Sequence, residues 1–99
     1  MITSGDDVYQ RRTRLRLTQQ QLAGEVGVSA GHVSQIENGL AHPNLQTAVL
    51  LEVALTEYER NIPRREPTIL RIGNKLSELS DSHIYQLQVY LEHILRDHY

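Results

Sequence analysis

The sequence predicts an all-α protein, on two observations. Apolar residues recur three or four positions apart in successive segments, which is the spacing of one face of an α-helix. Residues that cap helices stand directly ahead of these segments, and Gly or Pro lies between them. With 99 residues, 39 % of them hydrophobic and neither Trp nor Phe, the chain suffices for one small domain with an appendage and a modest aliphatic core.

The composition excludes several classes of protein. The chain has no Cys, so it has neither disulfides nor thiolate catalysis nor a Cys-based zinc site. No apolar run approaches the roughly eighteen residues that a membrane span needs. The first residues, MITSGDD, lack the basic and apolar regions of a signal peptide. We therefore expect a cytoplasmic protein without a membrane partner.

The first helix is expected from about Asp6 to Leu15. Acidic residues at its start suit the positive end of the helix dipole. Its apolar contribution is small and consists of Val8, Leu15 and Leu17. One further side chain must therefore be partly buried, and Arg12 is the best candidate.

Two short helices joined by a tight turn are predicted within the stretch from Thr18 to Gly39. Thr18 and Gln21 have the spacing of a capping box, in which each side chain satisfies a free backbone N–H of the first turn. The first of the two helices has an apolar stripe made of Leu22, Ala23 and Val26. Gly27 suits the left-handed residue that follows a helix, and Ser29 can cap the second helix.

The second of these helices has two different faces. Val33 and Ile36 lie on the side to be buried. At about 100° per residue, the other side carries small and amide-bearing residues, namely Gly31, Ser34, Gln35 and Asn38. Small residues allow close approach to a surface, and amide side chains can both donate and accept hydrogen bonds at the edges of base pairs. The stretch therefore predicts a DNA-reading element.

A fourth helix is expected from Leu45 to about Glu57, capped by Asn44. Its main apolar stripe consists of Leu45, Ala48, Leu51 and Leu55, with Val49 beside it. Leu50 and Val53 fall off this stripe and predict a second apolar face for the C-terminal helices to cover. Residues 59–67 combine two prolines with five charged residues, which indicates a linker.

The motif LTQQQLAGEVGVSAGHVSQIENGLAHP resembles the helix-turn-helix domains of phage repressor and Cro-like regulators, the xenobiotic-response-element type. The shared pattern is Thr-Gln-x-x-Leu-Ala, Gly-Val-Ser, Val-Ser-Gln-Ile-Glu-Asn-Gly and a later Pro, and the resemblance covers roughly residues 6–58. It implies a compact lambda-repressor-like domain over residues 1–58. Such a domain places a recognition helix, here about residues 30–38, in the major groove of double-stranded DNA. The expected location is therefore the nucleoid.

The resemblance also implies which residues touch DNA. Those placed at the bases are Ala30, Gly31, His32, Ser34 and Gln35. Gln35 is the strongest of them, because Gln can bond adenine through two hydrogen bonds. Ala30 can touch a thymine methyl group. Gly31 offers no side chain, so part of the selectivity is expected from DNA shape.

The residues that the resemblance places at phosphates are Arg11, Gln19, Ser29, Asn38 and His42. Three of them have a plainer interpretation. Arg11 can belong to a solvated helix face, Ser29 can serve as a cap alone, and His42 can be an exposed loop residue without a role.

An ion pair between Arg12 and Glu37 is a further implication of the resemblance. Glu37 flanks the apolar face of its helix, which supports the pair, and the alternative is two unrelated surface charges. Arg16 departs from the family pattern, which usually has Gly there to end the first helix. We therefore expect a less sharp turn at Arg16.

Residues 68–99 predict two short amphipathic helices, which cannot form a stable core alone. Their apolar residues are Ile69, Ile72, Leu76 and Leu79 in the first helix, and Ile84, Leu87, Tyr90, Leu91, Ile94 and Leu95 in the second. We expect a hairpin of these helices to join two copies of the chain into a homodimer. Two alternatives stay open: folding back over the core of the same chain, and docking of a small protein antagonist or toxin.

Together these observations predict a transcriptional repressor that binds an inverted-repeat operator as a dimer, and no enzyme. The five His residues are not spaced as a metal site and no phosphate-binding loop is present, so neither metal nor cofactor is expected. The formal net charge of −2 is unusual for a DNA-binding protein, so we expect modest affinity per monomer. The alternatives are an antitoxin or antagonist-controlled regulator, and a helix-turn-helix fold that serves only as a protein adaptor.

Overall fold

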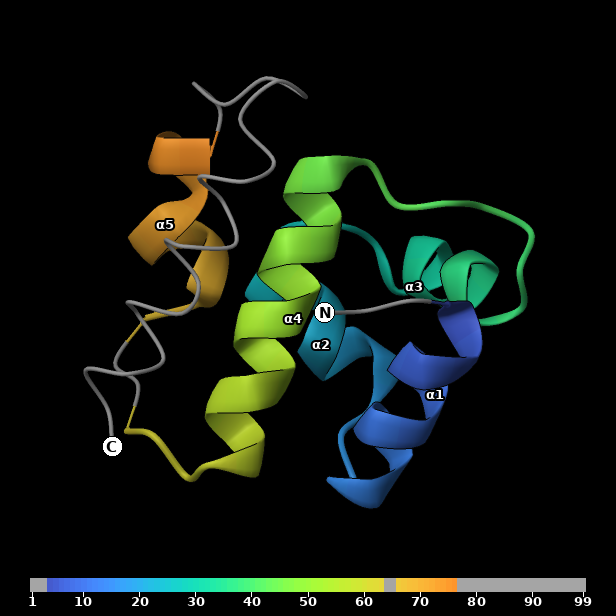
Figure 1. The fold of residues 1–99 in the computed structure, drawn as a ribbon, viewed down its shortest axis with the longest axis horizontal. Coiled ribbons are helices and arrows are strands. Elements are labelled where there is room, and N and C mark those ends of the chain that lie inside the picture. Colours follow the sequence, from blue (N-terminus) through green and yellow to red (C-terminus); the bar gives the residue numbers. More distant parts are fainter. Residues whose placement is uncertain (1–3, 64–65, 77–99) are drawn as a thin grey trace.

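The structure is a computed structural model that describes residues 4–63 and 66–76, and within these ranges all regular elements are helices (Figure 1). In chain order they are α1 (Gly5–Arg14), α2 (Gln19–Val26), α3 (Ala30–Glu37), α4 (Leu45–Glu59) and α5 (Thr68–Leu76). In Figure 1, α3 and α5 lie at opposite sides of the molecule, with α2 and α4 between them. The second C-terminal helix predicted from the sequence lies outside the described residues.

Side-chain caps define where the first four helices begin. The capping box of Thr18 and Gln21 is confirmed in both directions. Ser29 and Asn44 are confirmed as the caps of α3 and α4, and Ser4 caps α1 in the same way. Each cap satisfies a backbone N–H that the helix itself leaves free, so these boundaries follow from local sequence.

The core is aliphatic and centres on α4, which is buried on several sides. The largest fully buried apolar side chains are Val8, Leu22, Val26, Val33, Ile36, Val49, Leu51, Val53 and Leu55. The second apolar face that the sequence predicts for α4 is confirmed, because Leu50 and Val53 are buried. Leu50, Val53 and Glu57 follow one another at helical spacing, and α5 binds Glu57, so α5 lies along this face.

Three contacts hold α5 against α2 and α4. Ile72 is only 6 % exposed and belongs to the core. The backbone N–H and the hydroxyl of Thr68 both donate to one carboxylate oxygen of Glu25 at 3.1 Å. Arg71 forms an ion pair with Glu57, whose side chain is 0 % exposed. α5 is therefore part of the same packed unit as α1–α4.

This packing differs from the expectation that Ile69 and Ile72 face a second copy of the chain. Both pack within one copy, because α4 presents a second apolar face that α5 can cover immediately. Ile69 also lies against the turn of the motif, where a Cβ on Gly27 would stand 3.0 Å from its side chain. Leu76, also expected at a dimer interface, is the last residue of α5, and the other residues expected there, from Leu79 to Leu95, lie outside the described residues.

The turn after α1 is as tight as one with glycine, which corrects the expectation for Arg16. Arg16 has a φ of 58°, in the left-handed region, and its N–H bonds the carbonyl oxygen of Thr13 at 3.1 Å. The same region is taken by Gly27 and Gly39 after α2 and α3. A side chain in this conformation costs roughly 1 kcal/mol, which the packing on either side of the turn offsets.

Candidate nucleic-acid interface

The face of α3 predicted to read bases is the one that packing leaves accessible. Val33 and Ile36 are buried on the opposite face. Gly31 and Gln35 are exposed, and the other expected base readers, Ala30, His32 and Ser34, are half-buried. Ala30 also packs against the core, so part of its surface is used inside the protein.

Gly31 is not required by the protein's own packing. A Cβ built there would meet only the Ser29 hydroxyl oxygen, at 3.9 Å, which is ordinary contact distance. The backbone conformation at Gly31 is helical and suits any residue. The absence of a side chain therefore leaves a bare patch on the front of α3, against which another surface can come close.

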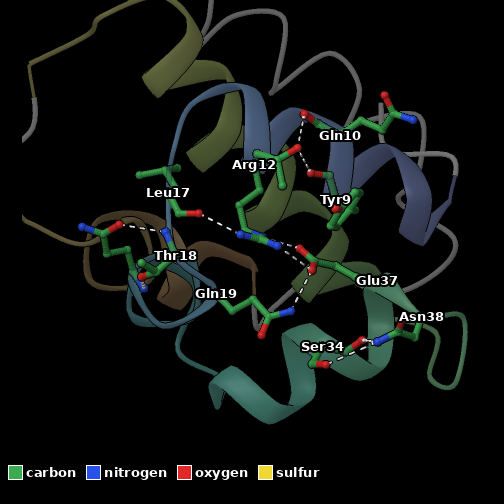
Figure 2. Close-up of polar contacts among 11 residues, drawn as sticks. Tyr9, Gln10, Arg12, Leu17, Thr18, Gln19, Ser34, Glu37 and Asn38 are labelled. Carbon is green, nitrogen blue, oxygen red and sulfur yellow. Dashed lines mark hydrogen bonds and ion pairs between the residues drawn. The ribbon is translucent and has the colours of Figure 1, made fainter.

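The buried carboxylate of Glu37 fixes how α3 sits on α1 (Figure 2). Arg12 Nε donates to Glu37 Oε2 at 2.6 Å, and Arg12 Nη2 donates to Glu37 Oε1 at 3.0 Å. The third guanidinium nitrogen donates to the carbonyl oxygen of Leu17 at 2.8 Å. The side chain of Glu37 is 3 % exposed. The hydrogen bond with Glu37 raises the pKa of Arg12 above its ordinary value, and the pair that the resemblance implies is present in the structure.

Gln19 joins the same carboxylate from α2. Its Nε2 donates to Glu37 Oε1 at 2.9 Å (Figure 2). One carboxylate thus links α1, α2 and α3, and it holds the first residue of α2 beside the end of α3. The second hydrogen on Gln19 Nε2 stays available for an acceptor outside this cluster.

The side chain of Arg11, expected to contact a phosphate, is bound to α4 inside the protein. Its guanidinium donates to the carboxylates of Glu52 and Glu59 and to the hydroxyl of Thr56, all on α4. The hydrogen bond with Glu59 is the main cause that raises the pKa of Arg11, and the side chain is only 14 % exposed. Arg11 therefore ties α1 to α4, a role that the sequence did not indicate, because its partners lie more than forty residues away.

The other expected phosphate contacts are closer to α3. The Ser29 hydroxyl oxygen accepts from the His32 N–H at 3.0 Å, so the cap is formed and its own hydrogen remains available. His42 and Asn38 both line a hollow of about 550 Å³ between the start of α1, the end of α3 and the loop before α4. Asn38 Nδ2 donates back to α3, to the carbonyl oxygen of Ser34 at 2.9 Å.

Several cations of the described region are engaged inside the protein. Arg11, Arg12 and Arg71, three of the ten Lys and Arg residues of the chain, are paired with carboxylates.

Within residues 4–63 and 66–76 no group of three His, Cys, Asp or Glu side chains is arranged to hold a metal ion. None of the described helices is both long enough and apolar enough to cross a membrane.

The comparison with protein families agrees with this arrangement. A family model described as Helix-turn-helix matches residues 8–56, which run from α1 into α4. The chain therefore belongs to this family, the Cro/CI type of helix-turn-helix protein. It is a DNA-binding regulator of the helix-turn-helix class. Neither the curated proteins nor the solved structures contain a match to the chain.

Proposed function

We propose that the chain is a transcriptional repressor that binds an inverted-repeat operator as a homodimer. The observation that carries the proposal is the accessible front of α3, held in place by the buried Glu37. A helix whose orientation is fixed by an ion pair can present the same side chains to every operator copy. Repression follows from occupying a promoter, so the protein acts at the nucleoid and needs no ligand chemistry.

In this proposal the exposed amide of Gln35 reads a base pair directly. Gly31 allows close approach of α3 to the groove, which its open surroundings support. Gln19, Ser29 and His42 contact phosphates. Gln19 and Ser29 each keep a polar hydrogen that the described contacts do not use, and the side chain of His42 is exposed. These phosphate contacts fix the register of α3 on the duplex.

The first test compares Gln35→Ala with Gln20→Ala in a gel-shift assay on the DNA upstream of the chain's own gene. Gln35→Ala should weaken binding to the preferred site about tenfold or more and leave non-specific binding unchanged, since a bidentate contact is lost. Gln20→Ala removes the same kind of amide from α2, at a surface that also includes Pro67. This control should change neither specific nor non-specific binding. Because Arg11, Arg12 and Arg71 are already paired with carboxylates, log affinity should fall with log salt at a shallow slope of roughly −2 to −4.

Sequence-independent binding by the wild-type chain would contradict the proposal. Equal effects of the two Gln substitutions would also contradict it. A lack of any DNA binding would favour the adaptor function instead.

The second test concerns the homodimer and uses light scattering on the full chain. The wild type should have the mass of a dimer, and Leu87→Glu should have the mass of a monomer, because the charge falls within the predicted apolar stripe. Gln86→Glu introduces a like charge beside that stripe and should stay dimeric. Leu87→Glu should weaken binding to an inverted repeat at least about tenfold, because the two half-sites no longer act together. A monomeric wild type that co-purifies with a second small protein would favour the antagonist-controlled regulator.

A further inference from the structure

Asn38 is held against Ser34 on the exposed front of α3. Asn38 Nδ2 lies 2.9 Å from the carbonyl oxygen of Ser34 and 3.4 Å from its hydroxyl oxygen (Figure 2). Asn38 directly follows α3, one helical turn beyond Ser34. The two residues therefore form one polar unit on the surface proposed to face DNA.

The chemistry of the carbonyl oxygen determines which way the amide of Asn38 points. A carbonyl oxygen can only accept a hydrogen bond, so the atom of Asn38 that faces it must be the NH₂ group. An amide nitrogen cannot accept a hydrogen bond. In its contact with this nitrogen, the hydroxyl of Ser34 is therefore the acceptor, and its own hydrogen points elsewhere.

The hydrogen of the Ser34 hydroxyl has no acceptor within the described part of the chain. Within the described residues, the hydrogen bond of the Ser34 hydroxyl oxygen is the one that it accepts from Asn38 Nδ2. A free serine hydroxyl can donate or accept and so distinguishes bases poorly. Asn38 takes up one of the two acceptor positions of the Ser34 hydroxyl, and this favours the use of that hydroxyl as a donor.

We infer that Asn38 is a positioning residue that makes Ser34 a hydrogen-bond donor, and that Ser34 thereby selects a base with an acceptor in the major groove. The inference rests on the proposed function. Acceptors there are guanine O6 and N7, thymine O4 and adenine N7, whereas cytosine presents only its amino group. Cytosine is therefore disfavoured at the position that Ser34 faces.

The same geometry changes the role expected for Asn38 itself. The amide nitrogen of Asn38 contacts both oxygens of Ser34, so the polar side-chain atom of Asn38 that has no hydrogen bond within the described residues is Oδ1. Oδ1 is an acceptor and cannot bond a phosphate oxygen. Asn38 therefore contributes to base selection rather than to phosphate contact through its side chain.

The test is selection of bound duplexes from a random-sequence library, read by sequencing, with full-length variants. The position that Ser34 faces is the one whose preference Ser34→Ala removes. There the wild type should disfavour cytosine about threefold to tenfold, the value of one hydrogen bond. Asn38→Ala should relax this preference although Ser34 is intact. Asn38→Asp should invert it towards cytosine, because a carboxylate accepts the Ser34 hydrogen and leaves the hydroxyl as an acceptor.

Gln35→Ala is the matched control and should change the preference at a different base pair. Circular dichroism on each variant verifies folding, and Asn38→Ala decides the matter if Asn38→Asp does not fold. The inference is overturned if Asn38→Ala lowers affinity for all sequences equally and keeps the preference at the Ser34 position. A wild type that enriches no sequence at all overturns the proposed function, and the inference with it.

Discussion

Replacing Arg71 by methionine is expected to lower the free energy of unfolding by about 3–5 kcal/mol. Arg71 donates to both oxygens of Glu57, whose side chain is 0 % exposed. Removing the guanidinium leaves that carboxylate buried without its partner, and a domain of this size has a total stability of only roughly 5–10 kcal/mol. Urea unfolding followed by circular dichroism measures the loss.

Two further variants isolate the ion pair. Glu57→Leu combined with Arg71→Met should regain most of the stability, because an apolar pair of similar volume replaces both charges. Arg14→Met removes the same charge from an exposed position and should change the free energy of unfolding by less than about 0.5 kcal/mol. A loss of the same small size for Arg71→Met would show that α5 is not held by this pair.

A large loss of stability in Arg71→Met would show that the folded domain extends beyond the residues that the family model matches. The match ends at residue 56, whereas Ile72, Thr68 and Arg71 pack against α2 and α4. Truncation at residue 60 would therefore remove part of the core together with any dimerisation element. The substitution Leu87→Glu tests self-association without this complication.

Arg12→Ala is expected to have the second large effect, a loss of about 3–5 kcal/mol of stability together with loss of specific DNA binding. Glu37 is 3 % exposed and would keep only its hydrogen bond from Gln19. Because Glu37 ends α3, its displacement also changes the angle at which α3 meets the groove. Urea unfolding gives the first quantity, and gel shifts at low temperature, where the variant remains folded, give the second.

Arg12→Lys serves as the matched variant for this prediction. Lysine keeps the charge but cannot make the two parallel bonds to Glu37 and the bond to the Leu17 carbonyl oxygen together. An intermediate loss, roughly half that of Arg12→Ala, is expected. An unchanged melting temperature for Arg12→Ala would mean that the contact between α1 and α3 does not depend on this pair.

The fold of the first four helices could be predicted from the sequence because the signals are local. A capping box such as Thr18 with Gln21 operates within one helical turn. The Ser29 and Asn44 caps and the left-handed Gly27 are likewise set by neighbours in the chain. The pairing of Arg12 with Glu37 came from the resemblance, supported by the position of Glu37 beside the apolar face of its helix, since no spacing rule relates residues twenty-five positions apart.

Other contacts in the structure had weaker signals in the sequence. Glu57 falls in line with Leu50 and Val53, and a carboxylate on an apolar face indicates a buried partner, although not which one. Ser34 and the C-cap residue Asn38 are four residues apart at the end of α3, so their proximity could be foreseen. Which atom of each residue faces the other is decided only by the three-dimensional structure.

The sequence by itself determined the helices, their caps and the face of α3 that stays accessible, because these depend on residues within a turn or two of one another. Only the tertiary structure decided what each amphipathic face and each charge meets. An apolar stripe specifies that a surface must be covered, but any surface of matching shape can cover it. Ile72 therefore packs on α4 of its own chain, and Arg11 binds Glu52 and Glu59 instead of facing solvent.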